Sequence, residues 1–310
     1  MTTPPEASMS APEHRSGFVA LVGRPNVGKS TLLNRLLGQK IAIVSSKPQT
    51  TRNRISGIRT LPGAQIVYVD TPGLHHPRSR LGEFMVATVA QALEAVDGVV
   101  LVEEATASPT VLDDESLEPL WRVSAPILLA LNKVDRVPDK SALLPVLDAY
   151  VRQGRFQELI PLSALHGDGV ERLEQSILTR LPPGPPFYPA DTLTDQPETF
   201  FVAETIREKL FLFTRQEIPY ASAVRVEELE DRGPAGRLSV RAVIFVEQPS
   251  QKAIVIGAGG AVLKRIGQAA RRELEAFFGV PVYLDLWVDV RRHWRRDVQA
   301  LRELGYRLTS

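Results

Sequence analysis

The sequence contains no cysteine, no long apolar run, and no N-terminal stretch in which basic residues precede apolar ones. The absence of cysteine excludes disulfides and thiolate metal sites, although it does not identify the redox compartment. A membrane-spanning helix needs about 18 consecutive apolar residues, and no run approaches that length. Residues 1–16 are rich in Pro, Ser, Thr and Ala and do not resemble a secretory signal, so we expect a flexible tail on a cytoplasmic protein.

Charge is unevenly distributed along the 310 residues, although the net charge is only +1. Residues 199–310 hold 18 Lys and Arg against 14 Asp and Glu, whereas residues 1–198 hold 19 against 22. A basic second half suggests contact with a polyanion such as nucleic acid. A solvated basic surface is the alternative, and charge alone does not separate the two.

Short apolar runs alternate with helical stretches in the first half of the chain, which predicts a doubly wound, mostly parallel α/β sheet. Ligands of such sheets lie at the carboxyl ends of the strands. The expected strands are 17–22, 64–70, 98–102, 126–131 and 159–162. The expected helices are 29–37, 83–95, 113–123, 140–152 and 169–181.

The stretch LPPGPPFYP at 181–189 can neither continue a helix nor enter a sheet. It predicts a first domain over 17–181 and a proline-rich linker over 182–198. The order of elements in 199–310 predicts a smaller α+β domain. Its expected elements are a helix at 199–214, strands at 222–230 and 237–247, a glycine loop at 257–260, a helix to 278, a strand at 282–290 and a terminal helix.

GRPNVGKS at 23–30 fits G-x-x-x-x-G-K-[ST], a loop whose backbone N–H groups wrap phosphates at a helix N-terminus. Lys29 is predicted to reach the β- and γ-phosphates, and the Ser30 hydroxyl to ligate Mg²⁺. A glycine turn before an ordinary helix is the alternative, which the strand–loop–helix setting disfavours. The predicted nucleotide contacts here are Gly23, Arg24, Pro25, Asn26, Val27, Gly28, Lys29, Ser30 and Thr31.

DTPG at 70–73 ends an apolar strand about forty residues after the phosphate loop. Asp70 would hold Mg²⁺ through its water shell, because Mg²⁺ keeps several waters in proteins. Gly73 could offer its N–H to the γ-phosphate. Such a tetrapeptide is a common turn by itself, but its place at this strand end favours nucleotide contact by Asp70, Thr71, Pro72 and Gly73.

Two further polar segments follow strands and predict a guanine site. In NKVD (132–135), Asp135 can accept hydrogen bonds from guanine N1–H and the 2-amino group together, while Asn132 and Lys133 tie the loop to the base and the phosphate loop. Such polar contacts reject the wrong base strongly. The backbone N–H groups of Ser163, Ala164 and Leu165 would face the guanine oxygen. Polar turns without a ligand are the alternative.

The polar stretch VSSKPQTTRNR at 44–54 lies between the phosphate-loop helix and DTPG. Its position suits a switch in which a threonine ligates Mg²⁺ only while the γ-phosphate is present. Thr51 is the preferred ligand and Thr50 the second choice. A solvent-exposed loop is the alternative.

In this order, the segments resemble those of translation-factor-related GTPases, and GRPNVGKST with QTTR narrows the resemblance to the Era-like GTPases. Leu74 follows DTPG where many GTPases place a water-orienting Gln, so intrinsic hydrolysis is expected to be slow or assisted. In related GTPases an Asn at the position of Asn26 accompanies K⁺ activation. The expected catalytic residues are therefore Lys29, Thr51, Gly73 and Asn26. Arg52 and Arg54 are considered for transition-state charge, with surface ion pairs as the favoured alternative.

The second half carries a G-x-x-G at 257–260 between an apolar stretch and a helix with an apolar stripe. This loop and the flanking elements resemble a type II KH domain, in which the glycines let RNA approach the backbone. Ala258 and Gly259 lack the lysine common in that loop, and Asp289 replaces an expected basic residue. Trp287 and Trp294 could stack bases, with Trp287 favoured as a core residue. The expected RNA contacts are Lys252, Gly257, Ala258, Gly259, Gly260, Lys264, Arg265, Arg291, Arg292 and Arg295.

The resemblance to the Era-like GTPases covers residues 17–310. It implies GTP and GDP as ligands with Mg²⁺, binding near the 3′ end of small-subunit ribosomal RNA, and a role in maturation of the small ribosomal subunit. We expect a monomer that does not bind DNA. The alternatives are a GTPase acting on another RNA, a factor at the inner face of the cell membrane whose basic surface touches anionic lipid, and an RNA-binding protein with a structural GTP site.

Overall fold

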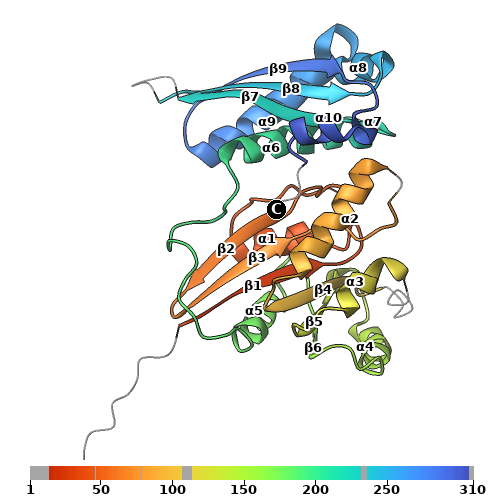
Figure 1. Cartoon of the computed structure of the whole chain (residues 1–310), viewed down its shortest axis with the longest axis vertical. Coiled ribbons are helices and arrows are strands. Elements are labelled where there is room, and N and C mark those ends of the chain that lie inside the picture. The colour runs from red at the N-terminus through yellow and green to blue at the C-terminus, as the bar shows by residue number, and fades with distance from the viewer. Residues whose placement is uncertain (1–13, 46, 78, 107–113, 232–235, 307–310) are drawn as a thin grey trace, which may run out of the picture.

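The computed structural model describes residues 14–45, 47–77, 79–106, 114–231 and 236–306. Two domains lie one above the other in Figure 1. The first has a six-stranded sheet in the order β2-β3-β1-β4-β5-β6, in which only β2 is antiparallel to its neighbour. Its strands are β1 (Arg15–Val22), β2 (Ile55–Leu61), β3 (Ala64–Asp70), β4 (Gly98–Glu104), β5 (Ile127–Asn132) and β6 (Glu158–Pro161).

Helices cover both faces of this sheet. The apolar stripes of α1 and α5 pack in one core cluster with β1, β3 and β5, and those of α2, α3 and α4 pack in a second cluster on the other face. The predicted doubly wound architecture is therefore confirmed. These helices are α1 (Lys29–Leu37), α2 (Arg80–Leu93), α3 (Glu118–Trp121), α4 (Leu143–Val151) and α5 (Val170–Leu178). Single turns lie at η2 (Glu115–Leu117), η3 (Val134–Arg136) and η4 (Lys140–Ala142).

At the edges of this domain, the sequence-based prediction misses one strand and places one boundary too late. β2 is not predicted by apolar runs, because ISGIRTL is an edge strand with glycine and polar residues. The tail predicted over 1–16 is too long, since β1 begins at Arg15, which pairs with Ala64. Residues 1–13 of that tail lie outside the described residues.

The proline-rich linker is docked along the sheet edge rather than being a free spacer. Ile58 N–H of β2 donates to the Leu193 carbonyl over 2.8 Å, and the Thr194 hydroxyl donates to the Ser56 carbonyl over 2.7 Å. Closer to β1, Phe187 N–H donates to Gln65 Oε1 over 2.7 Å. The linker thus follows the strand that comes directly after the predicted switch segment.

The second domain has a three-stranded sheet in which β8 pairs antiparallel with β7 and parallel with β9. Helices α6, α8 and α9 cover one face around a single core cluster. The elements are α6 (Glu198–Phe213), α7 (Ile218–Ala221), β7 (Ala223–Asp231), β8 (Leu238–Val246), α8 (Pro249–Ile256), η6 (Ala258–Gly260), α9 (Ala261–Phe278), β9 (Val282–Val290), η7 (Trp294–Arg296) and α10 (Val298–Glu303). This order confirms the predicted KH-type fold.

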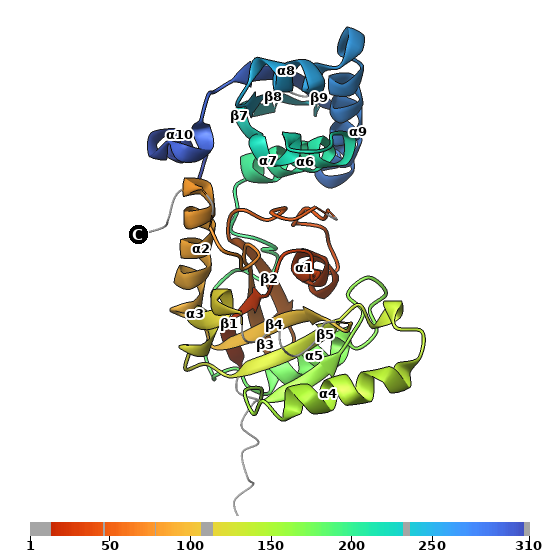
Figure 2. The ribbon, with the colours of Figure 1, turned by 90° about the vertical axis from the view of Figure 1, so that its right-hand side faces the viewer.

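A fourth core cluster joins the two domains. Leu81 and Met85 of α2 pack with Phe245 of β8 and with Trp294 and Tyr306 of the C-terminal segment. Figure 2 shows α10 beside the end of α2, and α6 as the helix of the second domain that faces the first. Within the described ranges, every helix is too short or too polar to cross a membrane.

Candidate functional site

The phosphate loop lies between β1 and α1 at the carboxyl end of the sheet. Gly28 precedes α1 with φ of 103° and no side-chain cap, so the first N–H groups of the helix are available to an anion. A Cβ at Gly28 would lie 2.3 Å from Asn132 Nδ2, which requires glycine at this close approach. The loop thus presents backbone donors to a phosphate, as the motif predicts.

Lys29 is buried inside its own loop. Its ammonium donates to the carbonyls of Gly23 over 2.9 Å and Arg24 over 3.0 Å. Burial lowers the pKa of Lys29 to about 8, against the raising influence of Asp70 and Glu103. Phosphate oxygens would replace the two carbonyls as acceptors and favour the charged amine.

Three oxygen-bearing side chains converge beside Lys29. The Ser30 hydroxyl lies 2.8 Å from Thr51 Oγ1 and donates to Asp70 Oδ2 over 2.7 Å. Asp70 Oδ1 is buried without a hydrogen-bond partner, and burial raises the pKa of this carboxyl to about 6. Hard oxygen donors around an unsatisfied buried carboxylate fit a Mg²⁺ ion, which would stabilise the ionised form.

The two adjacent threonines of the switch segment have different roles. Thr51 is buried and its hydroxyl faces Ser30 and Asp70, at 2.8 and 3.4 Å. The Thr50 hydroxyl donates to the Lys47 carbonyl over 2.7 Å and closes a local turn. The geometry therefore favours Thr51 over Thr50 as a metal ligand.

The DTPG segment contacts the phosphate loop through its backbone. A Cβ on Gly73 would lie 2.7 Å from the Pro25 nitrogen, so only glycine allows this approach. The Thr71 hydroxyl donates inward to the Leu21 carbonyl over 2.9 Å. Leu74 is buried in the core and its N–H donates to the Gly23 carbonyl over 3.1 Å. The side chain of residue 74 therefore points away from the position of an attacking water.

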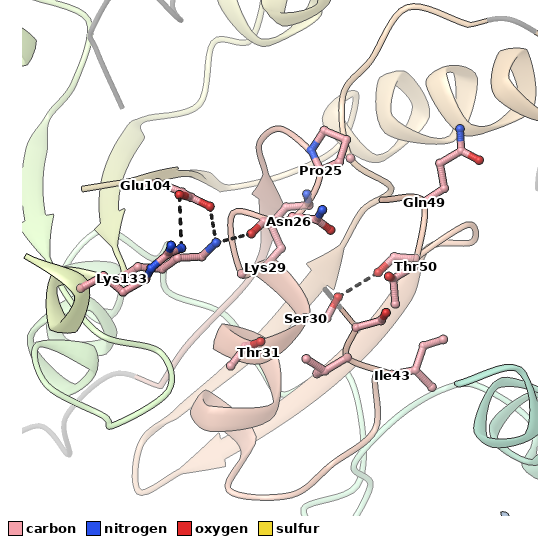
Figure 3. Close-up of a pocket in the computed structure, with 16 residues that line it drawn as sticks. Pro25, Asn26, Lys29, Ser30, Thr31, Ile43, Gln49, Thr50, Glu104 and Lys133 are labelled. Carbon is pink, nitrogen blue, oxygen red and sulfur yellow. Dashed lines mark hydrogen bonds and ion pairs between the residues drawn. The ribbon is translucent and has the colours of Figure 1, made fainter. Parts of the chain in front are cut away.

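The guanine loops are tied to the phosphate loop as predicted. Asn132 Nδ2 donates to the Val27 carbonyl over 2.8 Å, and the Lys133 ammonium donates to the Asn26 carbonyl over 2.6 Å. Figure 3 shows Lys133 directed toward both Asn26 and Glu104, with which it forms an ion pair. The Ser163 hydroxyl donates to Asp135 Oδ1 over 2.6 Å, which keeps the pKa of this exposed carboxylate below its usual range.

The prediction for the Ser163–Leu165 segment needs correction. The N–H of Ser163 donates to the Asp168 carbonyl over 2.8 Å, and that of Ala164 donates to Asn132 Oδ1 over 2.9 Å. Both N–H groups have acceptors inside the protein, so a guanine oxygen would have to share or replace those acceptors. The hydrogen bond from Ala164 orients the Asn132 amide, and the one from Ser163 stabilises the loop that follows it.

A pocket of about 460 Å³ lies between the phosphate loop, the switch segment and Lys133, and its lining does not include Asp70, Asn132, Asp135 or Ser163. Of the predicted residues, it is lined by Pro25, Asn26, Gly28, Lys29, Ser30, Thr31, Thr50, Thr51, Gly73 and Lys133. Gly23, Arg24 and Val27 lie behind it, and the Arg24 guanidinium is directed to Glu103 over 3.4 Å. Val44, Ser45 and Gln49 of the predicted switch segment also line it, and Gln49 has a φ of 58°. Sequence reasoning missed Ile43, Glu104 and Arg136, which complete the lining.

Arg52 is neither near the phosphates nor on the surface. Its side chain is 1% exposed and enters the C-terminal domain, where it donates to the Ser222 carbonyl over 2.7 Å. Arg54 does not line the pocket. The suggestion that Arg52 supplies transition-state charge is therefore wrong. The alternative expectation, that Arg52 forms an ion pair on the surface, is also wrong.

The G-x-x-G loop joins α8 to α9. Gly257 has φ of 73°, and a Cβ there would lie 2.5 Å from Val262 Cγ2. Gly259 and Gly260 also have positive φ. A groove of about 720 Å³ runs from Gly260 along α9 and β9, and it includes Lys264, Arg271 and Tyr283. This groove is where a KH domain would hold single-stranded RNA.

Several predicted basic contacts are engaged within the domain. The Arg265 guanidinium lies 4.7 Å from the Phe213 ring centroid. Arg291 pairs with Glu303 at 2.6 Å, and Arg295 with Glu247 at 2.5 Å. Both ion pairs are partly exposed, so phosphate contact from these arginines would compete with a carboxylate.

The two tryptophans have the opposite burial to that expected. Trp287 is 61% exposed on β9, and Trp294 is fully buried at the domain interface, where its ring stacks on Tyr306. The alternating pattern of β9 places Trp287 on the sheet face that the helices do not cover, and the C-terminal segment covers Trp294. Base stacking by Trp294 is therefore excluded.

Comparisons with known proteins identify both domains of the chain. Residues 18–133 match the 50S ribosome-binding GTPase family and residues 217–295 match the KH domain. The chain is 50% identical to GTPase Era of Geobacter metallireducens over 96% of this chain and 100% of that protein. It is 48% identical to GTPase Era of Lacticaseibacillus paracasei over 95% and 97%.

Two solved structures extend the similarity to the whole architecture. One is Era in complex with MgGDPNP and nucleotides 1506–1542 of 16S ribosomal RNA, with a TM-score of 0.90, 39% identity, and coverage of 95% of this chain and 100% of that one. The other is an Aquifex aeolicus Era variant bound to GDP and AlF4⁻, with a TM-score of 0.89, 40% identity and the same coverage. Because the similarity extends across both domains and nearly the whole length of the relatives, this chain belongs to the GTPase Era family and hydrolyses GTP.

Proposed function

We propose that the chain is a GTP-driven switch that binds the 3′ region of small-subunit ribosomal RNA and assists maturation of the small ribosomal subunit. The observation that carries this proposal is that the switch segment, which lines the nucleotide pocket, is bound through Arg52 to the domain that carries the KH groove. The relative solved with nucleotides 1506–1542 of 16S ribosomal RNA supports the choice of RNA.

The working division of the chain is a GTPase domain over 17–181 and a KH domain over 199–310, with the docked linker between them. β1 begins at Arg15, two residues before the predicted start of the GTPase domain, and α6 begins at Glu198, one residue before the predicted start of the KH domain. Both domains have cores of their own, which supports treating them as separate folding units.

Hydrolysis is transfer of the γ-phosphoryl group to water. Lys29 and the N–H groups at the start of α1 would stabilise the charge on the phosphates, and Gly73 N–H would face the γ-phosphate. Ser30 and Thr51 would hold Mg²⁺ directly and Asp70 through its waters, and the bound ion would neutralise charge between the β- and γ-phosphates. Leu165 N–H is the remaining candidate donor from its segment to the guanine oxygen.

Activation by K⁺ through Asn26 is part of the proposal. Asn26 lines the pocket with a φ of 66°, which turns the loop at the expected position of a monovalent cation. Turnover measured in K⁺ and in Na⁺ at equal ionic strength tests this. Faster turnover in K⁺ is expected, and equal rates would remove the cation from the mechanism.

The RNA function is tested by binding of a labelled 3′-terminal small-subunit ribosomal RNA fragment to the full chain. Affinity should be higher with a non-hydrolysable GTP analogue than with GDP, because the γ-phosphate and Mg²⁺ would engage Thr51 and Gly73, whose segments lead to the contacts of Arg52 and Leu81 with the second domain. A scrambled RNA of equal length is the control. Equal affinities in both nucleotide states would defeat the switch, and equal affinity for both RNAs would defeat the proposed target.

We also propose a cytoplasmic monomer, with weak association at the inner face of the membrane as the alternative. The exposed basic residues of the second domain, such as Lys264 and Arg292, support contact with any polyanion, including anionic lipid. Co-sedimentation with vesicles of anionic and neutral lipid, in competition with the RNA fragment, tests the membrane alternative. Binding to anionic vesicles would support it, and no binding to either kind of vesicle would contradict it.

A further inference from the structure

Arg52 joins the switch segment to the C-terminal domain through a buried receptor made of that domain's backbone. One terminal nitrogen donates to the Ser222 carbonyl over 2.7 Å and to the Tyr306 hydroxyl over 3.2 Å. The other donates to the carbonyls of Pro219 over 3.0 Å and Tyr220 over 3.3 Å. Four hydrogen bonds from one planar group determine its position and its orientation.

Two aromatic rings complete the receptor. The guanidinium carbon of Arg52 lies 6.0 Å from the ring centroid of Phe211 and 5.8 Å from that of Trp294. All four hydrogen bonds end on neutral oxygens, in a place that water does not reach. A buried charge is retained there only while those bonds are made, because losing them would leave it unsolvated. The receptor therefore holds Arg52 in one geometry.

A second anchor lies on the other side of Thr51. The Thr50 carbonyl accepts a hydrogen bond from Arg207 of α6, and Arg207 Nε is held by Glu204 over 2.6 Å. Arg207 is 1% exposed. Both sequence neighbours of Thr51 are thus attached to the C-terminal domain, Thr50 through its backbone carbonyl and Arg52 through its side chain.

Further contacts extend the same attachment toward the start of the switch segment. Val44 N–H donates to Glu208 Oε1 over 3.0 Å, and the Lys47 ammonium donates to the Thr214 carbonyl over 2.6 Å. The latter contact places a cation at the C-terminal end of α6, where the helix dipole favours it. The switch segment is therefore held along its length by α6 and α7.

We infer that Arg52 is a positioning residue for GTP hydrolysis: its attachment to the C-terminal domain places the Thr51 hydroxyl beside Ser30. This inference rests on the proposed role of Thr51 as a Mg²⁺ ligand. Ordering a mobile loop around the ion costs conformational entropy. A loop that is anchored to the C-terminal domain loses less entropy when the ion and the γ-phosphate bind. The RNA-binding domain thereby completes the hydrolytic site of the GTPase domain.

Four variants of the full chain test the inference: Arg52→Met, Arg52→Lys, Thr51→Ala and the control Arg59→Met. Arg59 is a partly exposed arginine of β2 in an ion pair with Glu174 at 3.2 Å, away from the pocket. The measurements are GTP turnover against Mg²⁺ concentration and GDP affinity at saturating Mg²⁺. Thermal unfolding and tryptophan fluorescence, to which the interface residue Trp294 contributes together with Trp121 and Trp287, report whether each variant is folded.

Arg52→Met should raise the Mg²⁺ concentration for half-maximal turnover by about tenfold, as loss of an outer-shell partner does at other metal sites. It should also lower kcat, while GDP affinity stays within about twofold because Thr51 contributes only when the γ-phosphate is present. Arg52→Lys should recover part of the loss, and Arg59→Met should match the wild type. A role confined to stability would change unfolding without moving the Mg²⁺ dependence.

The outcomes separate the inference from the proposed role of Thr51. Wild-type Mg²⁺ dependence in Arg52→Met, with a shift in Thr51→Ala, would overturn the inference and leave Thr51 as a ligand. No shift in Thr51→Ala would overturn both. If Arg52→Met does not fold, Tyr306→Phe decides, because it removes one hydrogen bond and keeps the ring against Trp294. A shift of about threefold is then expected, and no shift contradicts the inference.

Discussion

The ammonium group of Lys29 donates to the carbonyl of Gly23 over 2.9 Å, so the lysine is held inside the loop that is built to receive phosphates. The contact holds the buried ammonium on neutral carbonyls, while the carboxylates of Asp70 and Glu103 lie near enough to favour its charge. Burial lowers the pKa of Lys29 to about 8, which brings its titration into an accessible range.

Nucleotide binding should therefore take up protons near pH 8. The phosphates raise the pKa of Lys29, so the complex binds more protons than the free protein, and affinity falls as pH rises through about 8. About half a proton per site is expected at pH 8 and about a tenth at pH 7. Asp70, with a pKa of about 6, is almost fully ionised at pH 8 but still about a tenth protonated at pH 7, so the uptake at pH 8 is the one that reports Lys29.

Calorimetry of GDP binding in buffers of different ionisation enthalpy measures this uptake. Lys29→Arg keeps a positive charge whose pKa lies far above the window, so its uptake should vanish even though its affinity is lower. An uptake that is equal in the wild type and in this variant would assign the proton to another group.

Substituting Gly73 by alanine should disable hydrolysis more than binding. A Cβ there would lie 2.7 Å from the Pro25 nitrogen, so the DTPG segment would have to withdraw from the phosphate loop. A displacement of this kind lowers kcat by about ten- to a hundredfold, while GDP, which lacks the γ-phosphate, should bind nearly as before. Single-turnover hydrolysis together with GDP affinity measures both effects.

Gly98→Ala is the matched control for that substitution. A Cβ at Gly98 meets its nearest neighbour at 3.9 Å, which is ordinary contact distance. Turnover should be unchanged there. If the two alanine variants lost activity equally, close approach at Gly73 would not be the cause.

Asp135→Asn should change base preference from guanine to xanthine. The carboxylate accepts from guanine N1–H and the 2-amino group, whereas an amide can accept from N1–H and donate to the 2-oxygen of xanthine. GTP affinity should fall by about a hundredfold or more and XTP affinity should rise. Competition binding measures both, with the exposed surface variant Asp148→Asn as control. Unchanged preference would remove Asp135 from base recognition.

Ala258→Lys should strengthen RNA binding, and Ala258→Asp should weaken it. Ala258 is exposed in the G-x-x-G loop with an ordinary negative φ, so both side chains fit without strain. One added phosphate contact should steepen the dependence of log affinity on log salt by about 0.7 for single-stranded RNA. Filter binding over a salt series measures this.

The control for the loop variants is Ala142→Lys, which adds the same charge at an exposed position of the GTPase domain. Its salt dependence should equal that of the wild type. If Ala142→Lys and Ala258→Lys had the same effect, net charge rather than the loop would explain the change.

The nucleotide site was predictable because its chemistry belongs to short contiguous segments. Each segment follows a strand, and parallel strands bring their carboxyl ends to one edge, so Lys29, Asp70 and Asn132 had to lie close together. The role of Thr51 as a metal ligand stays a prediction, which its contacts with Ser30 and Asp70 support. Sequence could not show that the Ala164 N–H already has an acceptor in the protein, because that acceptor, Asn132 Oδ1, lies in a different loop.

The order of elements, the phosphate and guanine loops and the KH-type arrangement all follow from the sequence, because each depends on local residue types and on spacing. The burial of particular charged and aromatic side chains does not follow from it and is seen only in the folded chain. Arg52 reads as a surface residue and Trp294 as a base-stacking one, yet both are buried where α6, α7 and the C-terminal segment meet the switch segment. Burial at a domain interface is a property of two distant surfaces together, and no local pattern in either one encodes it.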